Sequence, residues 1–231
     1  MKLHATIGQV KRYGQQCPLA RALDVVGERW SMLIVRELIL GPRRYRDLQD
    51  GLPGIPTNLL AARLKDLQAN GIISKRSLPP PTAVTVYELT EAGHALRPAM
   101  TELRAWGRRH APPPAQTDVL QPAWALLSAS ARPTELPEGR TCELRVGAEF
   151  FHLYAQDSRL VVRGGPAPVA DGTIAMSAET LYGLMAGRRT AGRQLTADGN
   201  PMVTRTAVET LLGALAEGAA QRAGVSRPSR S

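Results

Sequence analysis

The sequence predicts an α+β protein built from two parts that differ in the order of their elements. Apolar residues recur at helical spacing across residues 18–70 and then alternate with polar residues over 72–89. Several short alternating segments follow between residues 142 and 176, and helical spacing returns after residue 177. Three consecutive prolines at 112–114 separate the two parts, because proline cannot continue a helix.

The proline segment sets the predicted domain boundary. Residues 112–117 have the composition of a linker, so we expect one domain over 1–111 and a second over 116–223. The final segment, 224–231, is made largely of glycine, serine, proline and arginine, and we expect it to be a disordered tail.

The positive charge of the chain is concentrated in its first half. The 231 residues carry a net charge of +9. Residues 1–110 hold 17 Lys and Arg against 9 Asp and Glu, whereas residues 111–231 hold 12 against 11. Clustered cations attract phosphates, so only the first half is predicted to bind a polyanion such as nucleic acid.

Cysteine usage and hydropathy restrict the cellular compartment. Cys17 and Cys142 lie far apart in the sequence and do not indicate a disulfide framework. No apolar run approaches the ~18 residues of a membrane span, and the N-terminus lacks the apolar segment of a signal peptide. These features predict a cytoplasmic protein with no membrane partner.

Three helices are predicted in the first 51 residues. The first runs from Pro18, which suits the first helical position, to about Val26. The second, over 30–40, is apolar on one broad face and ends at a Gly-Pro pair. A short helix over 43–51 opens with an Arg-rich turn and is followed by a turn at 52–55.

The next helix, predicted over 56–70, has the features of a helix that enters the major groove of DNA. Leu60, Leu64 and Leu67 define its inner face, and Asn70 with the following glycine marks its end. Its other faces carry short polar side chains at the leading end and cations beyond them. Such a surface permits a close approach to base edges.

Two strands and a long helix complete the first domain. Alternating segments at 72–78 and 84–89 flank a proline-rich tip at 79–82. A helix predicted over 90–109 carries an apolar stripe wider than a lone terminal helix needs, formed by Leu96, Met100, Leu103 and Trp106. This order of elements predicts a winged helix-turn-helix, with double-stranded DNA as its partner.

The residues expected to contact DNA lie on three elements: the start of the 43–51 helix, the exposed face of the 56–70 helix, and the wing. Helix N-termini and arginines favour phosphate oxygens, while asparagine pairs with adenine and arginine with guanine. We expect Arg63→Ala to weaken DNA binding with little change in stability. The predicted contacts are Arg43, Arg44, Arg46, Thr57, Asn58, Ala62, Arg63, Lys65, Lys75, Arg76 and Thr85.

Residues 17–109 resemble the HxlR-type winged-helix regulators of bacteria. The resemblance rests on short signatures that recur in order: CPLARAL at 17–23, GPRRY at 41–45, LPGI at 52–55, NGII at 70–73 and YELTEAG at 87–93. It implies a homodimer, joined through the N-terminal region and the last helix, that reads a pseudo-palindromic operator. Two-fold symmetry then places the half-sites about one helical turn apart, roughly 34 Å.

Cys17 has two interpretations. Some members of the family that the sequence resembles sense oxidants through a cysteine at this position, and helix N-termini stabilise thiolates. The other interpretation is a small buried residue at the helix cap, and we favour it because the second domain could do the sensing instead. Cys142 alternates with apolar residues on a predicted strand, so we expect it in the core.

The second domain is predicted to be α+β with an antiparallel sheet. Strands are expected at 142–146, 151–155, 160–162 and 173–176, and helices near 123–130, 177–185 and 201–219. Residues 171–215 resemble the sterol carrier protein fold, which implies an apolar tunnel between sheet and helices. The candidate ligand-binding residues are Leu153, Leu160, Met176, Leu181, Met185, Met202 and Leu211, although a place in an ordinary core is the better explanation for each of them taken singly.

These features favour a DNA-binding transcriptional regulator, a repressor that acts as a homodimer and responds to an apolar effector in the second domain. The four histidines show no metal-ligand spacing, and neither a nucleophile elbow nor a phosphate loop is present, so we expect no enzyme, metal or cofactor. Two alternatives stay open. The chain could carry hydrophobic small molecules, or it could regulate transcription through the redox state of Cys17.

Overall fold

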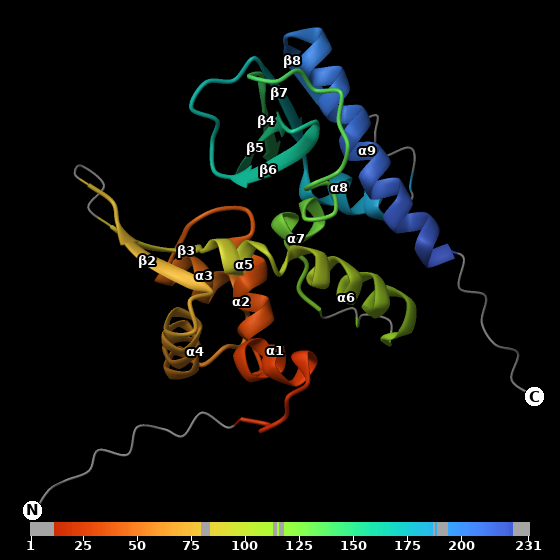
Figure 1. Ribbon diagram of the computed structural model, residues 1–231. Helices are drawn as coiled ribbons and strands as arrows, with labels where there is room; N and C mark the ends of the chain where they lie inside the picture. Colours follow the sequence, from red (N-terminus) through yellow and green to blue (C-terminus); the bar gives the residue numbers. More distant parts are fainter. Residues whose placement is uncertain are drawn as a thin grey trace, which may run out of the picture. The chain divides into compact units, whose positions relative to one another are not determined.

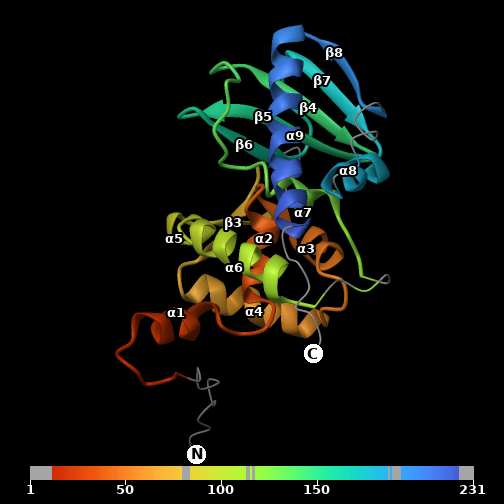
Figure 2. The same cartoon turned by 90° about the vertical axis from the view of Figure 1, so that its right-hand side faces the viewer.

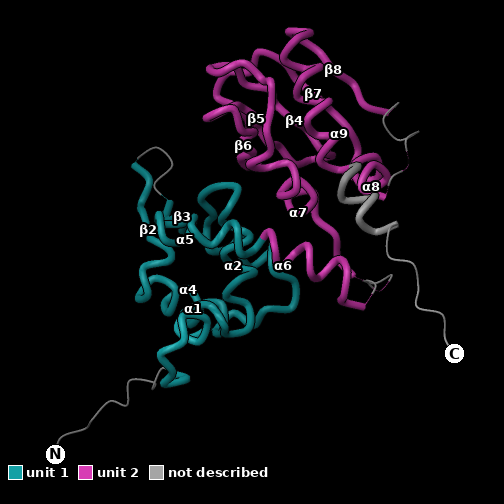
Figure 3. The backbone as a smooth tube through the Cα atoms, turned by 45° about the vertical axis from the view of Figure 1, so that its right-hand side comes forward, with its two compact units in different colours: residues 1–100 teal, residues 101–231 magenta. Residues whose placement is uncertain are grey.

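A computed structural model describes residues 12–79, 84–112, 115, 118–186, 188 and 194–223, with side chains omitted for 216–223. The chain divides into two compact units, residues 1–100 and 101–231, and each is described by itself (Figure 3). Both the tip of the wing at 80–83 and the tail at 224–231 lie outside the described residues. Among the residues that are described, no helix is long and apolar enough to cross a membrane.

The first unit has helices followed by a small sheet (Figure 1). Leu60, Leu64 and Leu67 are buried, as their helical spacing predicted, and their helix packs against the one that carries the buried Ile34 and Val35. The elements are α1 (Pro18–Val26), α2 (Ser31–Leu38), β1 (Arg43–Arg44), α3 (Tyr45–Gly51), α4 (Thr57–Ala69), β2 (Ile73–Ser77), β3 (Thr85–Leu89), α5 (Glu91–His94) and the start of α6 (Arg97–His110).

The wing is part of a three-stranded antiparallel sheet in the order β1-β3-β2. Tyr87 on the central strand is paired with Arg43 on one side and Lys75 on the other. Paired residues point to the same face of a sheet, so these three side chains form one row. The pattern did not predict β1, because a strand of two residues is too short to show alternation.

The single helix predicted over 90–109 is divided into α5 and α6. Pro98 has no N–H to donate to the preceding turn, so it suits the first turn of a new helix rather than the interior of a long one. Thr90 caps α5 by accepting a hydrogen bond from the N–H of Gly93 at 3.2 Å. At Gly93, α5 passes so close to the carbonyl of Ile72 that a Cβ atom would overlap it.

The second unit has a five-stranded sheet in the order β6-β5-β4-β7-β8. The prediction of an antiparallel sheet was wrong for one pairing, because β7 runs parallel to β4. The long connection from β6 carries the chain past β5 and β4, so β7 enters beside β4 in the same direction. The elements are α7 (Pro122–Leu126), β4 (Thr141–Val146), β5 (Glu149–Gln156), β6 (Arg159–Gly164), β7 (Gly172–Met176), α8 (Ala178–Met185), β8 (Thr196–Gly199) and α9 (Pro201–Ala223).

One face of this sheet forms the core of the second unit. Cys142, Leu153 and Val162 lie in register across β4, β5 and β6, and all three are buried. The α9 helix packs against β4, β7 and β8, and Figure 2 shows it running along the sheet. Cys142 is therefore a core residue, as predicted, and burial raises the pKa of its thiol to about 12, with Glu143 adding to the effect.

Both margins of the sheet have distinct features. At one margin, Pro133 forms a bridge with Arg159 of β6, and the neighbouring backbone bonds to Leu160. At the other margin, all four residues of β8 are exposed. The sequence did not predict β8, because a wholly exposed strand shows no apolar alternation.

A carboxylate fixes the entry into β7. Asp171 accepts hydrogen bonds from the N–H of Thr141 at 2.8 Å and from Nη1 of Arg140 at 2.6 Å. The backbone N–H of Thr141 is the larger cause and the Arg140 guanidinium the second cause of a pKa for Asp171 below its ordinary value. This hydrogen bond thus joins the end of the connection from β6 to β7 to Thr141, the first residue of β4.

Candidate DNA-binding surface

The α3 and α4 helices form a helix-turn-helix whose second helix is held at its leading end. Tyr45 at the start of α3 donates from its hydroxyl to the carbonyl of Thr57 at 2.8 Å. Gln49 Nε2, one turn later, donates to Thr57 Oγ1 at 2.9 Å. The buried Ile55 anchors the turn between the helices, and Gly54 supplies its positive φ of 82°. These contacts fix the N-terminus of α4 relative to α3.

The outward face of α4 matches the sequence prediction at most positions. Thr57, Asn58, Ala62 and Lys65 are exposed, while the leucines of the opposite face are buried. Asn58 Oδ1 accepts a hydrogen bond from the N–H of Leu59 at 2.9 Å, so its side chain rests on the first turn. The exposed face of α4 therefore carries short side chains at its leading end and a cation, Lys65, further along.

Arg63 does not point freely from this face. Its Nη2 and Nη1 atoms each lie 2.8 Å from a carboxylate, of Glu28 and Asp66 respectively, and its Nε donates to the carbonyl of Arg29 at 3.4 Å. The side chain is only 17% exposed. The guanidinium thus links α4 to the segment before α2, and it would have to break two ion pairs to reach DNA. Contact between Arg63 and DNA stays a prediction, one that this geometry disfavours.

Cations without ion pairs gather at the start of α3 and on α4. Arg44 and Arg46 are exposed, Arg43 is half-buried, and Lys65 is exposed. Within the part of the chain that the structure describes, none of these four forms a salt bridge. Asp47 Oδ2 accepts a hydrogen bond from the N–H of Arg44 at 2.9 Å and so caps α3. This cluster, together with Lys75, is the free cation group of the surface.

The wing residues differ in how far their charge is available. Lys75 is exposed, and its Nζ lies 6.0 Å from the centre of the Tyr87 ring, within reach of a cation–π contact. Arg76 forms two hydrogen bonds with the Glu88 carboxylate, which raise its pKa. Thr85 begins β3 opposite Ser77 and is half-buried. Lys75 is therefore the cation of the wing best placed for a phosphate.

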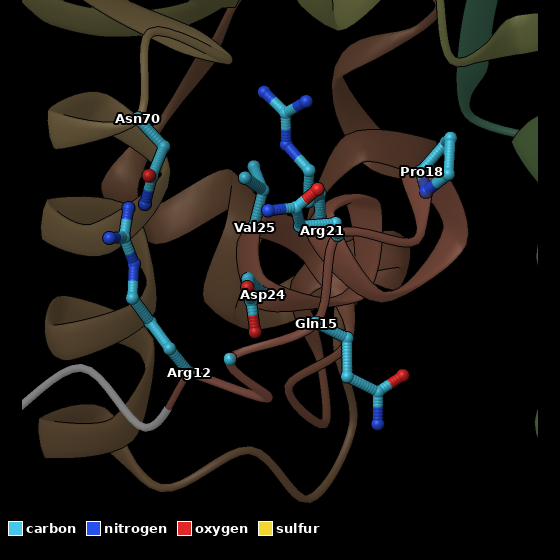
Figure 4. A pocket seen from close by; sticks show the side chains of 9 residues that line it. Arg12, Gln15, Pro18, Arg21, Asp24, Val25 and Asn70 are labelled. Carbon is cyan, nitrogen blue, oxygen red and sulfur yellow. The ribbon is translucent and has the colours of Figure 1, made fainter.

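A surface hollow of about 890 Å³ lies between α1 and the segment that precedes it (Figure 4). Gln16 and Pro18 line it and flank the exposed Cys17. In Figure 4 the Arg12 side chain extends toward Asn70, at the end of α4. Cys17 itself does not line the hollow, but it carries the only exposed thiol among the described residues, so it is not the buried cap residue that one interpretation of the sequence expected.

The predicted ligand-binding residues of the second unit are mostly ordinary core. Leu153, Leu160, Met176, Leu181 and Leu211 are buried and fill the space between sheet and helices. Met202 differs from them, since it is 56% exposed in the first turn of α9, which does not suit a residue lining an internal tunnel. Met185 lines a cavity, but a different one from the expected apolar tunnel.

Sequence reasoning missed the residues that hold the leading end of α4. Tyr45 and Gln49 lie four residues apart on α3, so both face α4, and that spacing was a usable signal. Glu28 was not recognisable, because its partner Arg63 lies 35 residues away.

The fold and surface define a winged helix-turn-helix protein, and comparison with known proteins agrees. The HxlR-like helix-turn-helix family matches residues 25–115. The HTH-type transcriptional regulator YodB of Bacillus subtilis is 36% identical over 98 residues, which are 42% of this chain and 88% of YodB. The regulator YvaP of the same organism is 36% identical over 94 residues, 40% of this chain and 86% of YvaP.

The chain belongs to the HxlR-like helix-turn-helix family. A solved structure of reduced YodB is 34% identical and covers 44% of this chain and all of that one, with a TM-score of 0.39. The family match ends at residue 115, so it accounts for the winged helix and α6.

Proposed function

We propose that this protein is a DNA-binding transcriptional regulator that inserts α4 into the major groove of duplex DNA. The observation that carries the proposal is the leading end of α4, where Thr57 and Asn58 are exposed while Tyr45 and Gln49 fix the helix from behind. Because these contacts already fix the start of α4, its binding to base edges costs little further conformational entropy. The side-chain amide of Asn58 forms hydrogen bonds with adenine, and the small side chain of Ala62 lets the wall of the major groove approach the helix closely.

The free cations supply the affinity for phosphates. Arg44 and Arg46 stand at the N-terminus of α3, where backbone N–H groups also favour anions. Lys65 and Lys75 extend the charge along α4 and the wing. Each neutralised phosphate contributes about 0.9 to the slope of log K against log salt, so binding should depend steeply on salt.

We propose further that the regulator is a homodimer on a pseudo-palindromic operator and that it represses transcription. Leu103 and Trp106 are each 56% exposed on α6, and Leu19 and Leu23 are exposed on α1. Large apolar side chains at helical spacing are typical of helices that pack against a partner. A second copy of the chain, with two-fold symmetry, would cover these faces and place two α4 helices one helical turn apart.

Fluorescence anisotropy with the duplex upstream of the gene, and with a scrambled duplex, tests the proposal at two salt concentrations. We expect Lys65→Ala to weaken binding to both duplexes about tenfold and to lower the salt slope by about 1. Asn58→Ala should keep the slope and lose discrimination between the duplexes. Arg205→Ala, an exposed cation on α9, is the control and should change neither. A wild-type chain that binds both duplexes equally would refute the proposal and favour a carrier of small molecules.

A second candidate function is thiol-based sensing by Cys17. The observation that favours it is an exposed thiol at the start of α1 beside the hollow lined by Gln16 and Pro18. An oxidant or electrophile would modify the exposed Cys17 thiol and change the surface around α1. If Cys17→Ser loses DNA binding on oxidation just as the wild type does, the thiol has no part in regulation.

A further inference from the structure

One row of side chains in the sheet of the first unit brings a tyrosine between two cations. Arg43 of β1 is paired with Tyr87 of β3, and Tyr87 is paired with Lys75 of β2. Paired residues point to the same face, so the three side chains lie side by side, and we call them the Tyr87 row. Because neighbouring strands are about 4.8 Å apart, the backbone positions of the row span roughly 10 Å.

The Tyr87 side chain has a hydroxyl that no group of the protein uses. Two residues along on the same face, Ile73 is paired with Leu89 and both are buried, so the row lies where the buried base of the sheet passes into the exposed wing. Tyr87 is half-buried. Within the residues that the structure describes, its hydroxyl makes no hydrogen bond, although it is not enclosed in the interior. A phenol hydroxyl can donate one hydrogen bond, so this donor is open to a ligand.

Both cations of the row keep their charge available to an anion. Neither Arg43 nor Lys75 forms a salt bridge with another described residue. Lys75 Nζ lies 6.0 Å from the centre of the Tyr87 ring, so the ammonium group stays close to the tyrosine. The opposite face of the wing differs, because Arg76 there is neutralised by the Glu88 carboxylate at 3.0 Å. The Tyr87 row is therefore the face of the wing that suits an anion.

We propose that the Tyr87 row binds one phosphate of the DNA backbone, with the Tyr87 hydroxyl as a donor and Arg43 and Lys75 on either side. The inference rests on the proposed function, since it takes duplex DNA as the ligand. A phosphate group presents several oxygens, so it can accept hydrogen bonds from three side chains at once. Hydroxyl groups and cations both bond to phosphate oxygens, and a hydrogen bond from O–H to an anionic oxygen is one of the stronger kinds.

The row would position the helix-turn-helix on the duplex. β1 continues directly into α3, whose Tyr45 holds the start of α4 by its hydrogen bond to Thr57. A phosphate bound to the row would therefore fix the distance between the DNA backbone and the leading end of α4. Contacts to phosphates carry no sequence information, so the row should strengthen binding to every duplex and leave base recognition to α4.

Fluorescence anisotropy of the full chain with the scrambled duplex tests the row, because sequence discrimination plays no part in that measurement. Tyr87→Phe removes the hydroxyl and keeps the ring. We expect this variant to bind about tenfold more weakly, because it loses a hydrogen bond to a charged group, and to keep the salt slope of the wild type. Arg43→Met and Lys75→Met should also weaken binding, and each should lower the salt slope by about 1.

A double-mutant cycle tests whether the row binds a single phosphate. Side chains that share one partner are coupled, so the combined loss from Tyr87→Phe and Lys75→Met should fall short of the product of the single losses by at least about threefold. Tyr154→Phe is the matched control, since Tyr154 is also half-buried on a strand but belongs to the second unit. It should bind the duplex as the wild type does.

The outcomes separate the row from the proposed function. The inference is overturned if Tyr87→Phe binds the scrambled duplex like the wild type, if Tyr154→Phe weakens binding equally, or if the double-mutant cycle is additive. A wild type that binds both duplexes equally refutes only the regulator proposal, because the effect of the row is still measured. Circular dichroism verifies the folding of each variant, and the exposed Lys75 provides an independent test if Tyr87→Phe does not fold.

Discussion

Replacing Arg63 by alanine separates a bracing role from a DNA-contacting role on α4. The variant loses two ion pairs of 2.8 Å, to Glu28 and Asp66, whose carboxylates are more than half exposed. Each such pair contributes about 0.2–1 kcal/mol. Two largely buried methylene groups are also lost, at up to about 0.8 kcal/mol each, and the helix propensity of alanine offsets a small part. We expect a loss of about 2 kcal/mol in the free energy of unfolding.

The assay is urea unfolding followed by circular dichroism, with thermal unfolding alongside. A loss of that size should lower the Tm by about 4–8 °C in a chain of this length. Lys65→Ala is the matched control two residues away, because Lys65 is exposed and should change stability by no more than about 0.5 kcal/mol. The bracing role is refuted if Arg63→Ala unfolds like the wild type while losing as much DNA affinity as Lys65→Ala.

Three further measurements test the packing and the electrostatics. Gly93→Ala should destabilise the first unit by about 1–3 kcal/mol, because the added Cβ would overlap a backbone carbonyl. Gly107→Ala, with open space around it, should instead stabilise its helix by about 0.5–1 kcal/mol. Equal unfolding midpoints for the two variants would contradict this. The pKa of Asp171 is lowered in the folded state, so the ionised carboxylate adds to the free energy of unfolding fully above pH ~4, and this stabilisation is lost as the pH falls through the folded pKa. Asp171→Asn should therefore lose less of its free energy of unfolding in acid than the wild type does. Urea unfolding from pH 6 to pH 2 measures this difference. Iodoacetamide at pH 8 should alkylate the exposed Cys17 and spare Cys142, whose pKa is about 12, and mass spectrometry of the native protein that found both modified would oppose this interpretation.

Local patterns were sufficient to predict the winged helix from the sequence. The i, i+4 and i+7 spacing of Leu60, Leu64 and Leu67 placed α4 within one residue at each end. The alternation around Val86 placed β3, and the glycine after Asn70 marked the end of the helix. Each of these signals lies within a few residues of the element that it defines.

Features that depend on distant partners were not predictable in the same way. The parallel pairing of β4 with β7 depends on where a crossover loop returns, and alternation within either strand carries no information on this. An arginine at position 63 gives no indication in the sequence of whether its side chain faces solvent or pairs with Glu28. The Tyr87 row takes one residue from each of three strands, so no single strand indicates in the sequence that its members meet.

The two margins of the second sheet restrict how copies of this protein can associate. An open strand edge invites another chain to add its own backbone, the usual beginning of aggregation. Here one outer strand is already engaged by the stretch around Pro133, and the opposite one presents a carboxylate at Asp198 and a glycine with a φ of 90°. With both outer strands protected in this way, the second unit is not expected to add strands from another copy, so any association of copies would have to use other surfaces.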